Sequence, residues 1–301
     1  MANILISGGS GLLGRRLTSI LTEKGHHVSI LSRSRHSSTS VKYIVWNVEK
    51  QILPPQAVAN TEIIIHLAGA GIADHRWTNS YKKKILTSRT SSADLIFQTL
   101  KNNPNNVHTF LSASAVGYYG HTGNVWIDEL QPAANDFMGN VCKQWEKSAL
   151  QFESLKIRVA LLRTGVVLSD EGGALPVLAR TVMFFAGAPL GNGDQYIPWI
   201  HIDDICKMYL FLIENKTLHG AFNANAPSPL ENTFFMTLLG RILKRPIWPI
   251  NVPAFLLKII LGEKSVVILN GQRTSAEKIK RAGFIFDYSD PEIALRDLLL
   301  K

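Results

Sequence analysis

A glycine-rich turn near the N-terminus constrains the fold of this chain more than any other feature of the sequence. Gly8, Gly11 and Gly14 follow one another in the spacing G-x-x-G-x-x-G. An apolar run at residues 3–7 precedes the turn, and residues 15–24 follow it with leucine and isoleucine at helical spacing. Glycines in such a turn let the backbone approach a pyrophosphate, which the positive end of the following helix attracts. The turn therefore predicts a strand, a phosphate-binding loop and a helix.

The end of the second expected strand indicates which dinucleotide would bind. This strand lies at residues 27–31, after the helix stops at Gly25, and it leads into Ser32 and Arg33. Asp or Glu at this point usually binds the ribose 2′-hydroxyl of NAD, whereas an arginine suits the 2′-phosphate of NADP. We therefore predict NADP(H) rather than NAD(H). The residues expected to contact it in this unit are Gly8, Ser10, Gly11, Leu12, Leu13, Gly14, Ser32 and Arg33.

Strands and helices are expected to alternate through the first half of the chain. Further β-type runs lie at residues 63–67, 108–112 and 159–163, with helical patterns between them. This alternation predicts the α/β class and a Rossmann-type doubly wound parallel sheet. Loops rich in glycine and proline then become frequent. We therefore predict an NADP-binding Rossmann domain at residues 1–165 and a smaller α+β C-terminal lobe at residues 166–301, which forms the substrate cleft.

The C-terminal lobe is expected to contain a helix at residues 202–214 and a short strand at residues 220–224. Residues 250–270 are apolar enough to raise the question of a membrane span. Lys258 and Glu263 interrupt them, however, well short of the roughly 20 apolar residues that a span needs. We therefore predict a buried or groove-lining helix there and no membrane partner.

The charge and cysteine content narrow the class of protein. The formal net charge is +9, but the lysines and arginines are spread along the chain without a recognition motif, so no nucleic-acid partner is predicted. A phosphorylated ligand would account for part of the charge. Cys142 and Cys206 form neither a CxxC motif nor a set with metal-ligand spacing, so we predict no disulfide framework and no metal site. A reducing, cytoplasmic location follows from the same observation.

Several motifs carry a resemblance to a known family. They are GGSGLLG at residues 8–14, HLAGA at 66–70, SASAVGYYG at 112–120 and WIHIDD at 199–204. Together they resemble the extended short-chain dehydrogenase/reductase superfamily. More closely, the chain is similar to an atypical NAD-dependent epimerase-like branch, described as SDR39U1 or SulA-like. LNGQ at residues 269–272 and AGFIFDY at 282–288 resemble the tail domain of that branch, whose function is unknown and which we expect at about residues 248–296.

This resemblance implies an NADP(H)-binding Rossmann domain and a smaller lobe that closes over a cleft. Ser32 and Arg33 match the family's 2′-phosphate pair. The cofactor-binding residues that the resemblance adds are Leu67, Ala68 and Gly69 in the turn after the fourth strand, Arg89, which matches an arginine that reaches the cofactor, and Lys143, which would bind the ribose.

The catalytic pair of the superfamily is not intact. Its lysine normally lowers the pKa of a tyrosine in Tyr-x-x-x-Lys, so that the phenolate exchanges a proton as hydride moves. Ser114 matches the serine that hydrogen-bonds the substrate oxygen, but the expected tyrosine segment reads DFMGNVCKQWE, with Phe137 and Met138 near the tyrosine position. Tyr118 or Tyr119, after the strand that bears the serine, would replace it as acid or base. Alternatively, these tyrosines wall the nicotinamide pocket by packing.

Five other residues have both a functional and a structural interpretation. Asp203 and Asp204 would form a carboxylate pair or, as we prefer, cap the following helix. His201 is predicted to be a hydrogen-bonded structural histidine. Trp77 and Trp199 line the substrate cleft or belong to the core, and the sequence does not separate these alternatives.

Two functions are consistent with these features. The first is an NADP(H)-dependent oxidoreductase or epimerase that acts on a small or nucleotide-linked substrate, with Ser114 orienting it and Tyr118 or water replacing the missing acid. The second is a non-catalytic NADP(H)-binding sensor or partner protein, which the lost tyrosine favours. Ser114, the cleft loops and the C-terminal lobe favour the first function, which we prefer. A homodimer paired through helices that flank the sheet is a further expectation.

Overall fold

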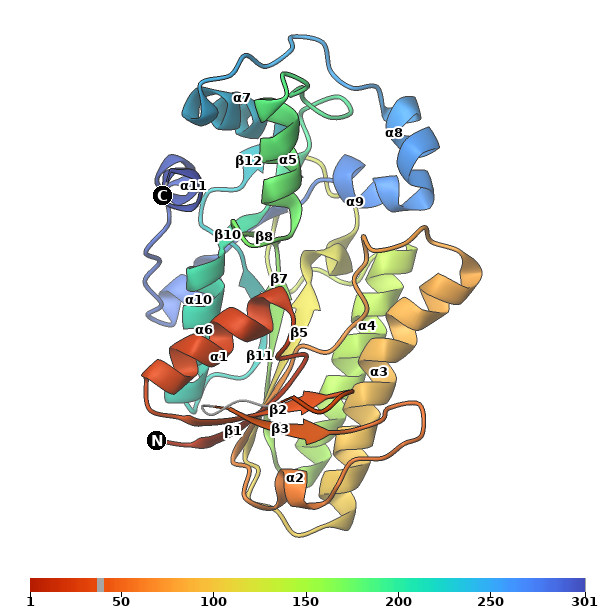
Figure 1. Cartoon of the computed structure of the whole chain (residues 1–301), viewed down its shortest axis with the longest axis vertical. Helices are drawn as coiled ribbons and strands as arrows, with labels where there is room; N and C mark the ends of the chain where they lie inside the picture. The colour runs from red at the N-terminus through yellow and green to blue at the C-terminus, as the bar shows by residue number, and fades with distance from the viewer. Residues whose placement is uncertain (37–40, 301) are drawn as a thin grey trace.

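A seven-stranded parallel sheet forms the centre of the molecule (Figure 1). The structure is a computed structural model that describes residues 1–36 and 41–300. In order across the sheet, the strands are β11 (Gly220–Ala224), β7 (Arg158–Thr164), β5 (Thr109–Ala115), β4 (Ile63–His66), β1 (Asn3–Ser7), β2 (His27–Ser32) and β3 (Lys42–Val45). The predicted Rossmann-type doubly wound sheet is confirmed. β3 was not predicted, because this short edge strand is only partly buried and carries no clear apolar pattern.

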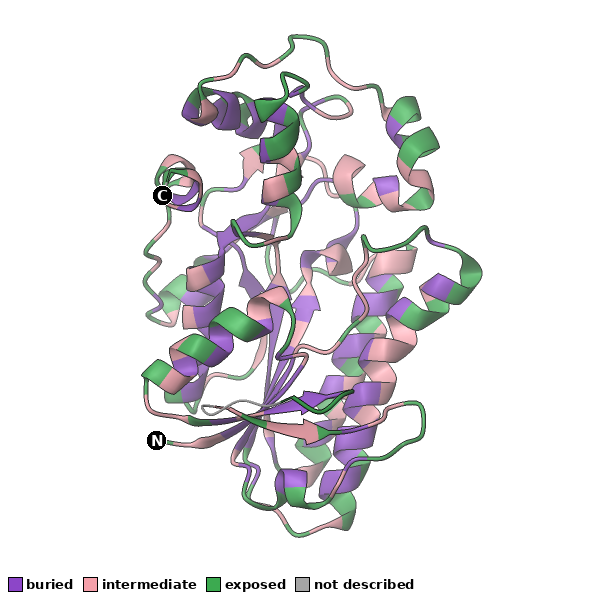
Figure 2. Ribbon diagram, in the orientation of Figure 1, coloured by how far each residue is buried: buried purple, intermediate pink, exposed green. Residues whose placement is uncertain are grey.

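Helices cover both faces of the sheet, which explains the continuous apolar runs in its strands. In β1, Ile4 and Ile6 pack in a core with α1 (Leu12–Glu23) and α6 (Ile202–Glu214). Leu5, between them, points to the opposite face. It packs there in a second core with α2 (Gln56–Ala59), α3 (Asn79–Asn102) and α4 (Phe137–Leu150). Figure 2 shows the buried strands between these partly exposed helices.

The chain returns to the central sheet after the predicted domain boundary at residue 165. β11 pairs with β7 along its whole length, and α6 packs against α1. Both elements were expected in the C-terminal lobe, so the structure differs from that division over residues 202–224. The physical reason is that the edge of β7 needs hydrogen-bond partners, which β11 supplies.

The other C-terminal elements form a lobe with its own core, in the upper part of Figure 1. Leu175, Trp199, Phe235 and Leu295 meet in this core. The elements that form the lobe around it are β8 (Val166–Leu168), α5 (Ala174–Met183), β9 (Tyr196–Ile197), β10 (Trp199–His201), β12 (Leu230–Glu231), α7 (Asn232–Leu243) and α11 (Pro291–Leu299). α10 (Glu277–Arg281) instead contacts β11 and contributes Ile279 to a core of the central sheet.

The apolar segment at residues 250–270 is exposed rather than buried. It forms α8 (Ala254–Leu261), the short 3-10 helix η3 (Gly262–Ser265) and α9 (Val266–Leu269). Leu257 is the sole buried residue of α8. The buried alternative of our prediction is therefore wrong for α8, which among the described residues packs mainly against the adjacent η3. The groove-lining alternative stays a prediction. No helix in the described part of the chain is long and apolar enough to cross a membrane.

Candidate cofactor and substrate site

The glycine turn lies directly against the turn that follows β4. Gly8 has a φ angle of +76°, in the left-handed region, and a Cβ atom there would lie 2.7 Å from the carbonyl carbon of Leu67 and 2.8 Å from the amide nitrogen of Ala68. A Cβ atom on Gly14 would lie 2.4 Å from the carbonyl oxygen of Gly8. Glycine is therefore required at both positions. The structure brings these four predicted residues together.

The start of α1 offers free amide groups beside this turn. Gly11 is the N-cap residue, and within the described residues no side chain caps the helix and no acidic residue lies in its first turn. Because the first amides of a helix have no intrahelical partner, those of Leu12, Leu13 and Gly14 are donors for an external group. Ser10 is exposed next to them. The donor set and the positive end of the helix dipole therefore fit a pyrophosphate.

The end of β2 lies beside the same turn. A Cβ atom on Gly9 would lie 2.8 Å from the side chain of Ile30 in β2. Ser32 is buried and its hydroxyl oxygen accepts a hydrogen bond from the amide of Ser34 at 3.3 Å, whereas Arg33 is exposed. No carboxylate stands between residue 32 and residue 36, so this strand end suits a 2′-phosphate better than a 2′-hydroxyl.

Arg89 of α3 is a buried cation at the turn after β4. A Cβ atom on Gly69 would lie 2.9 Å from its guanidinium carbon. The guanidinium donates to the carbonyl oxygens of Ala70 at 3.1 Å and Ile85 at 2.8 Å, and it lies 4.9 Å from the ring centre of Trp145. Burial lowers the pKa of Arg89. The predicted neighbours Gly69 and Arg89 are thus in contact, with positive charge held at the edge of the turn.

Ser114 belongs to a buried polar network that joins β5, α4 and β7. Its hydroxyl donates to Glu146 Oε1 at 2.7 Å. Glu146 also accepts two hydrogen bonds from Arg163, at 2.8 Å from Nε and 2.9 Å from Nη2, and these two side chains are only 7% and 5% exposed. The proton of Ser114 is therefore directed at Glu146. Its contact with a substrate oxygen stays a prediction.

The two candidate tyrosines on η1 (Val116–Tyr119) have different environments. Tyr119 is buried, accepts from Arg163 Nη1 at 2.9 Å and donates to Asn223 Oδ1 at 2.6 Å. Burial raises the pKa of the Tyr119 phenol, which makes it a poor acid or base at neutral pH. The ring of Tyr118 is only partly buried and lies 3.6 Å from the guanidinium carbon of Arg163. Tyr118 is the accessible one of the pair.

Met138 and Cys142 occupy the side of α4 that faces η1. A Cβ atom on Gly117 would lie 3.4 Å from Met138 Cβ and 4.0 Å from Cys142 Sγ. Their spacing of four residues is the same as in Tyr-x-x-x-Lys, and the groups that this face of α4 presents to η1 are a thioether and a thiol. Burial raises the pKa of the Cys142 thiol to about 12, which keeps it protonated. Sequence analysis did not assign a role to Cys142.

Lys143 is not among the side chains that face η1. It is exposed on α4, one residue beyond the buried Cys142 and therefore about 100° further around the helix. The signal that could have settled this register is Asp136, whose carboxylate accepts a hydrogen bond from the amide of Gly139 at 2.7 Å and so marks Phe137 as the first helical residue.

The two tryptophans with alternative interpretations are both buried in hydrophobic cores. Trp77 packs with Tyr81 and its indole nitrogen donates to the carbonyl oxygen of Ile72 at 2.8 Å. Trp199 belongs to the core of the C-terminal lobe, and its indole nitrogen donates to the carbonyl oxygen of Ser228 at 2.8 Å. Both are therefore core residues.

The WIHIDD motif holds elements together. His201, rather than either aspartate, caps α6, since its Nδ1 accepts a hydrogen bond from the amide of Asp203 at 3.1 Å. Asp203 forms an ion pair with Arg16 of α1 at 2.6 Å. Asp204 accepts hydrogen bonds from the amides of residues 287–288, each at 3.0 Å, and burial raises its pKa to about 6. The aspartates thus have separate structural partners, although the predicted cap is formed by their neighbour.

The C-terminal tail is joined to the loop that follows η1. β13 (Arg273–Thr274) pairs with β6 (Trp126–Ile127), and Gln272 Nε2 donates to the carbonyl oxygen of Gly120 at 2.6 Å. The sequence carried no signal for this contact, because the two segments are far apart along the chain. Through it, the lobe positions the loop next to Tyr118.

Comparison with known proteins agrees with this geometry. Residues 4–224 match the model of the NAD dependent epimerase/dehydratase family. The chain belongs to this family. Residues 252–298 match a domain of unknown function, DUF1731, where the sequence predicted a family tail domain.

Members of the epimerase/dehydratase family resemble the whole chain. Epimerase family protein YfhF of Bacillus subtilis is 35% identical over 99% of this chain and 98% of its own length. Epimerase family protein SH2119 of Staphylococcus haemolyticus is 36% identical over 99% of each chain. The crystal structure of human epimerase family protein SDR39U1 with NADPH superposes with a TM-score of 0.89, at 26% identity over 99% of both chains. The predicted relationship to this branch is confirmed.

A more distant solved structure shares the fold alone. The UDP-glucose 4-epimerase of Thermotoga maritima, solved with UDP-glucose, has a TM-score of 0.79 at 18% identity, over 98% of this chain and 97% of its own. This chain therefore has the complete fold of that protein.

Proposed function

We propose that this protein binds NADP(H) at the glycine turn and uses it as an oxidoreductase or epimerase on a small or nucleotide-linked substrate. The observation that carries the proposal is the uncapped start of α1, where Gly11 leaves the first amides free beside a turn packed on Leu67. Such a helix start binds phosphate groups. Human SDR39U1, which is similar over its whole length, was solved with NADPH.

The form of the cofactor follows from the end of β2. Arg33 is an exposed guanidinium and Ser32 a hydroxyl at the point where NAD-selective proteins carry a carboxylate. A guanidinium would donate charge-assisted hydrogen bonds to a 2′-phosphate. Arg89 would add a second positive charge on the opposite side of the glycine turn, next to Gly69.

Tyr118 and Ser114 would supply the proton transfer and the substrate orientation that accompany hydride transfer. NADP(H), when bound, supplies or accepts a hydride. Tyr118 would hold the exchangeable proton at its phenol oxygen, while Arg163, stacked on its ring, keeps the ring in place. Ser114 would orient a substrate hydroxyl by accepting its hydrogen bond, because its own proton is donated to Glu146.

A second candidate function is a non-catalytic NADP(H)-binding sensor. Met138 and Cys142 favour it, because they stand on the face of α4 from which a tyrosine and a lysine would reach the reacting atoms. A thioether exchanges no proton, and a thiol with a pKa of about 12 exchanges one only slowly at neutral pH. The cytoplasmic location and the homodimer stay predictions for either function.

Isothermal titration tests the cofactor assignment. We expect NADPH to bind at least about ten-fold more tightly than NADH, since a charge-assisted hydrogen bond contributes about 1.5–3 kcal/mol. Arg33→Ala should remove this preference by weakening NADPH alone. Lys101→Ala, which removes an exposed charge at the far end of α3, is the matched control. Equal affinity of the wild type for NADH and NADPH would contradict the assignment.

Turnover separates the two functions. Purified protein with NADPH is offered a panel of carbonyl compounds, and nicotinamide absorbance is followed. With NADP+ it is offered nucleotide sugars, and the sugar products are analysed directly, because an epimerase returns its cofactor to the starting oxidation state. The enzyme proposal predicts turnover that Tyr118→Phe lowers by a factor of about 100, whereas Tyr43→Phe, on the edge strand β3, leaves it unchanged. Tight NADPH binding without turnover on any compound would favour the sensor instead.

A further inference from the structure

Large apolar side chains are exposed together at one end of the C-terminal lobe. They lie where α5 ends and where the strap of residues 244–253 leads from α7 to α8, at the end of the long axis opposite α2 (Figure 1). We call this surface the apolar tip. Its main residues, each more than half exposed, are Phe184, Phe185, Trp248, Ile250, Phe255 and Ile259.

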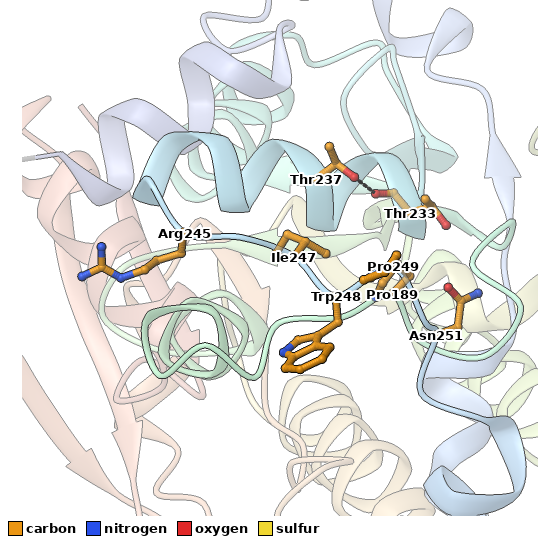
Figure 3. Close-up of a pocket in the computed structure, with 8 residues that line it drawn as sticks. All are labelled: Pro189, Thr233, Thr237, Arg245, Ile247, Trp248, Pro249 and Asn251. Carbon is orange, nitrogen blue, oxygen red and sulfur yellow. Dashed lines mark hydrogen bonds between the residues drawn. The ribbon is translucent and has the colours of Figure 1, made fainter.

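Hydrogen bonds hold the strap against the end of α5. The indole nitrogen of Trp248 donates to the carbonyl oxygen of Phe185 at 2.7 Å. The backbone amide of Trp248 donates to the carbonyl oxygen of Gly187 at 2.9 Å. The amide of Val252 then donates to the carbonyl oxygen of Pro189 at 2.8 Å. Figure 3 shows the Trp248 ring on the side of the strap that faces away from α7. The strap and the Trp248 ring are therefore held in place.

The backbone of Phe185 is strained in this arrangement. Its φ angle is +59°, in the left-handed region that a bulky residue rarely adopts. The guanidinium of Arg245 lies 5.0 Å from its ring centre. This conformation ends α5, because the amides of Phe185 and Ala186 donate to the carbonyl oxygens of Val182 and Thr181 at 3.0 and 2.8 Å. Here it keeps an aromatic ring in solvent, next to a cation.

α8 extends the apolar tip without being a loose element. The segment after it is anchored, because Lys264 in η3 donates to the carbonyl oxygen of Ala73 at 3.0 Å in the Rossmann domain. Phe255 and Ile259 lie one turn apart on α8, and both are exposed, with Lys258 beside them. An ordered helix that exposes apolar side chains is typical of a surface that another molecule covers.

The charges around the apolar tip decide what kind of molecule would cover it. Every charged residue in the ranges 174–193 and 232–262 is a lysine or arginine, and the acidic residues that adjoin these ranges are Asp194, Glu231 and Glu263, the last paired with Lys82. Arg180, Lys244 and Lys258 are exposed among the basic residues. A second copy of this chain would bring positive charge against positive charge at a symmetric interface, which is unfavourable. An anionic surface is complementary to this rim.

In contrast to the prediction of no membrane partner from the sequence, we propose that the apolar tip docks the protein on the surface of a membrane that contains anionic lipids. The aromatic rings and α8 would enter the boundary between headgroups and acyl chains, while Arg180, Lys244, Arg245 and Lys258 contact lipid phosphates. This is a peripheral mode of binding, in which a short helix lies in the interface. It places the cofactor turn, on the other domain, away from the lipid.

Vesicle flotation tests the proposal with the full chain. We expect the protein to float with vesicles of equal parts phosphatidylglycerol and phosphatidylcholine, but not with phosphatidylcholine alone, and to bind less at high salt. The double variant Phe255→Ser, Ile259→Ser should weaken binding at least about ten-fold. Lys258→Glu should weaken it at least about five-fold, because one basic residue near an anionic surface contributes about that factor.

Matched controls carry the same substitutions elsewhere on the surface. Leu130→Ser replaces another exposed apolar residue, and Lys101→Glu reverses an exposed charge at the end of α3; both should leave flotation unchanged. NADPH affinity and far-UV circular dichroism check that each variant is folded. The proposal is overturned by absent flotation, by equal loss in the controls, or by loss in Lys258→Glu without loss in the double variant. It is also overturned if light scattering reveals a dimer that the double variant dissociates.

Discussion

The buried ion pair between Glu146 and Arg163 gives the sharpest prediction about stability. Its two hydrogen bonds, at 2.8 and 2.9 Å, join α4 to β7, and both side chains are almost fully buried. Glu146→Gln keeps the volume and removes the charge, so Arg163 becomes a buried cation without a counter-ion. Breaking such a pair costs about 3–5 kcal/mol. We expect the free energy of unfolding to fall by about 3 kcal/mol.

Urea denaturation followed by tryptophan fluorescence and circular dichroism measures this loss. The control is Glu292→Gln, which breaks surface pairs with Arg296 and Arg241 and should cost about 1 kcal/mol or less for each pair. A double variant, Glu146→Gln with Arg163→Met, should recover part of the loss, because it removes the uncompensated charge as well. If Glu146→Gln costs no more than Glu292→Gln, the buried pair does not stabilise the site as we have argued.

Three further predictions concern the cofactor turn, the tail and the pH dependence of stability. Gly8→Ala places a Cβ atom 2.7 Å from the backbone of Leu67 at a residue with a positive φ angle. Calorimetry should therefore detect no NADPH binding, and urea denaturation should show that the free energy of unfolding falls by at least about 2 kcal/mol. Wild-type affinity for NADPH would refute this. Gln272→Ala removes the buried hydrogen bond to Gly120 and should lower the free energy of unfolding by about 1–2 kcal/mol. Amide hydrogen exchange in the loop after η1 should become faster. Unchanged exchange would argue against the tail contact. Asp204 has a folded-state pKa of about 6, above its usual 3.8, so the stability that it contributes is complete below about pH 4 and is lost as the pH rises through 6. The difference in unfolding free energy between wild type and Asp204→Asn should therefore change between pH 4 and pH 6, and a constant difference would contradict the raised pKa.

The local pattern of the sequence was enough to predict strands β1, β2, β4, β5 and β7 of the central sheet and the glycine turn. β1 and β4 are short apolar runs because both of their faces are covered, and such runs are visible in any single sequence. Gly8 and Gly14 are required by backbone contacts within a few residues and by one neighbouring turn. The helix at residues 202–214 and the strand at 220–224 were also predicted at their observed positions, as α6 and β11.

Features that depend on long-range contacts were not predicted. The placement of β11 in the central sheet depends on pairing with β7, some sixty residues earlier in the chain, which local periodicity does not report. The exposure of α8 was missed for the related reason that an apolar sequence does not reveal whether another element covers it. The network around Glu146 combines residues from β5, α4 and β7, so no local sequence motif predicts it.

The sequence by itself determined that this chain carries a glycine turn of the Rossmann type, because glycine spacing acts through local backbone geometry. The tertiary structure decided which side chains meet there. Met138 and Cys142, rather than Lys143, lie on the face of α4 that packs against η1. The hydroxyl of Ser114 donates its proton to Glu146. The reason is that helix rotation and strand order, which set these contacts, come from packing across the whole domain.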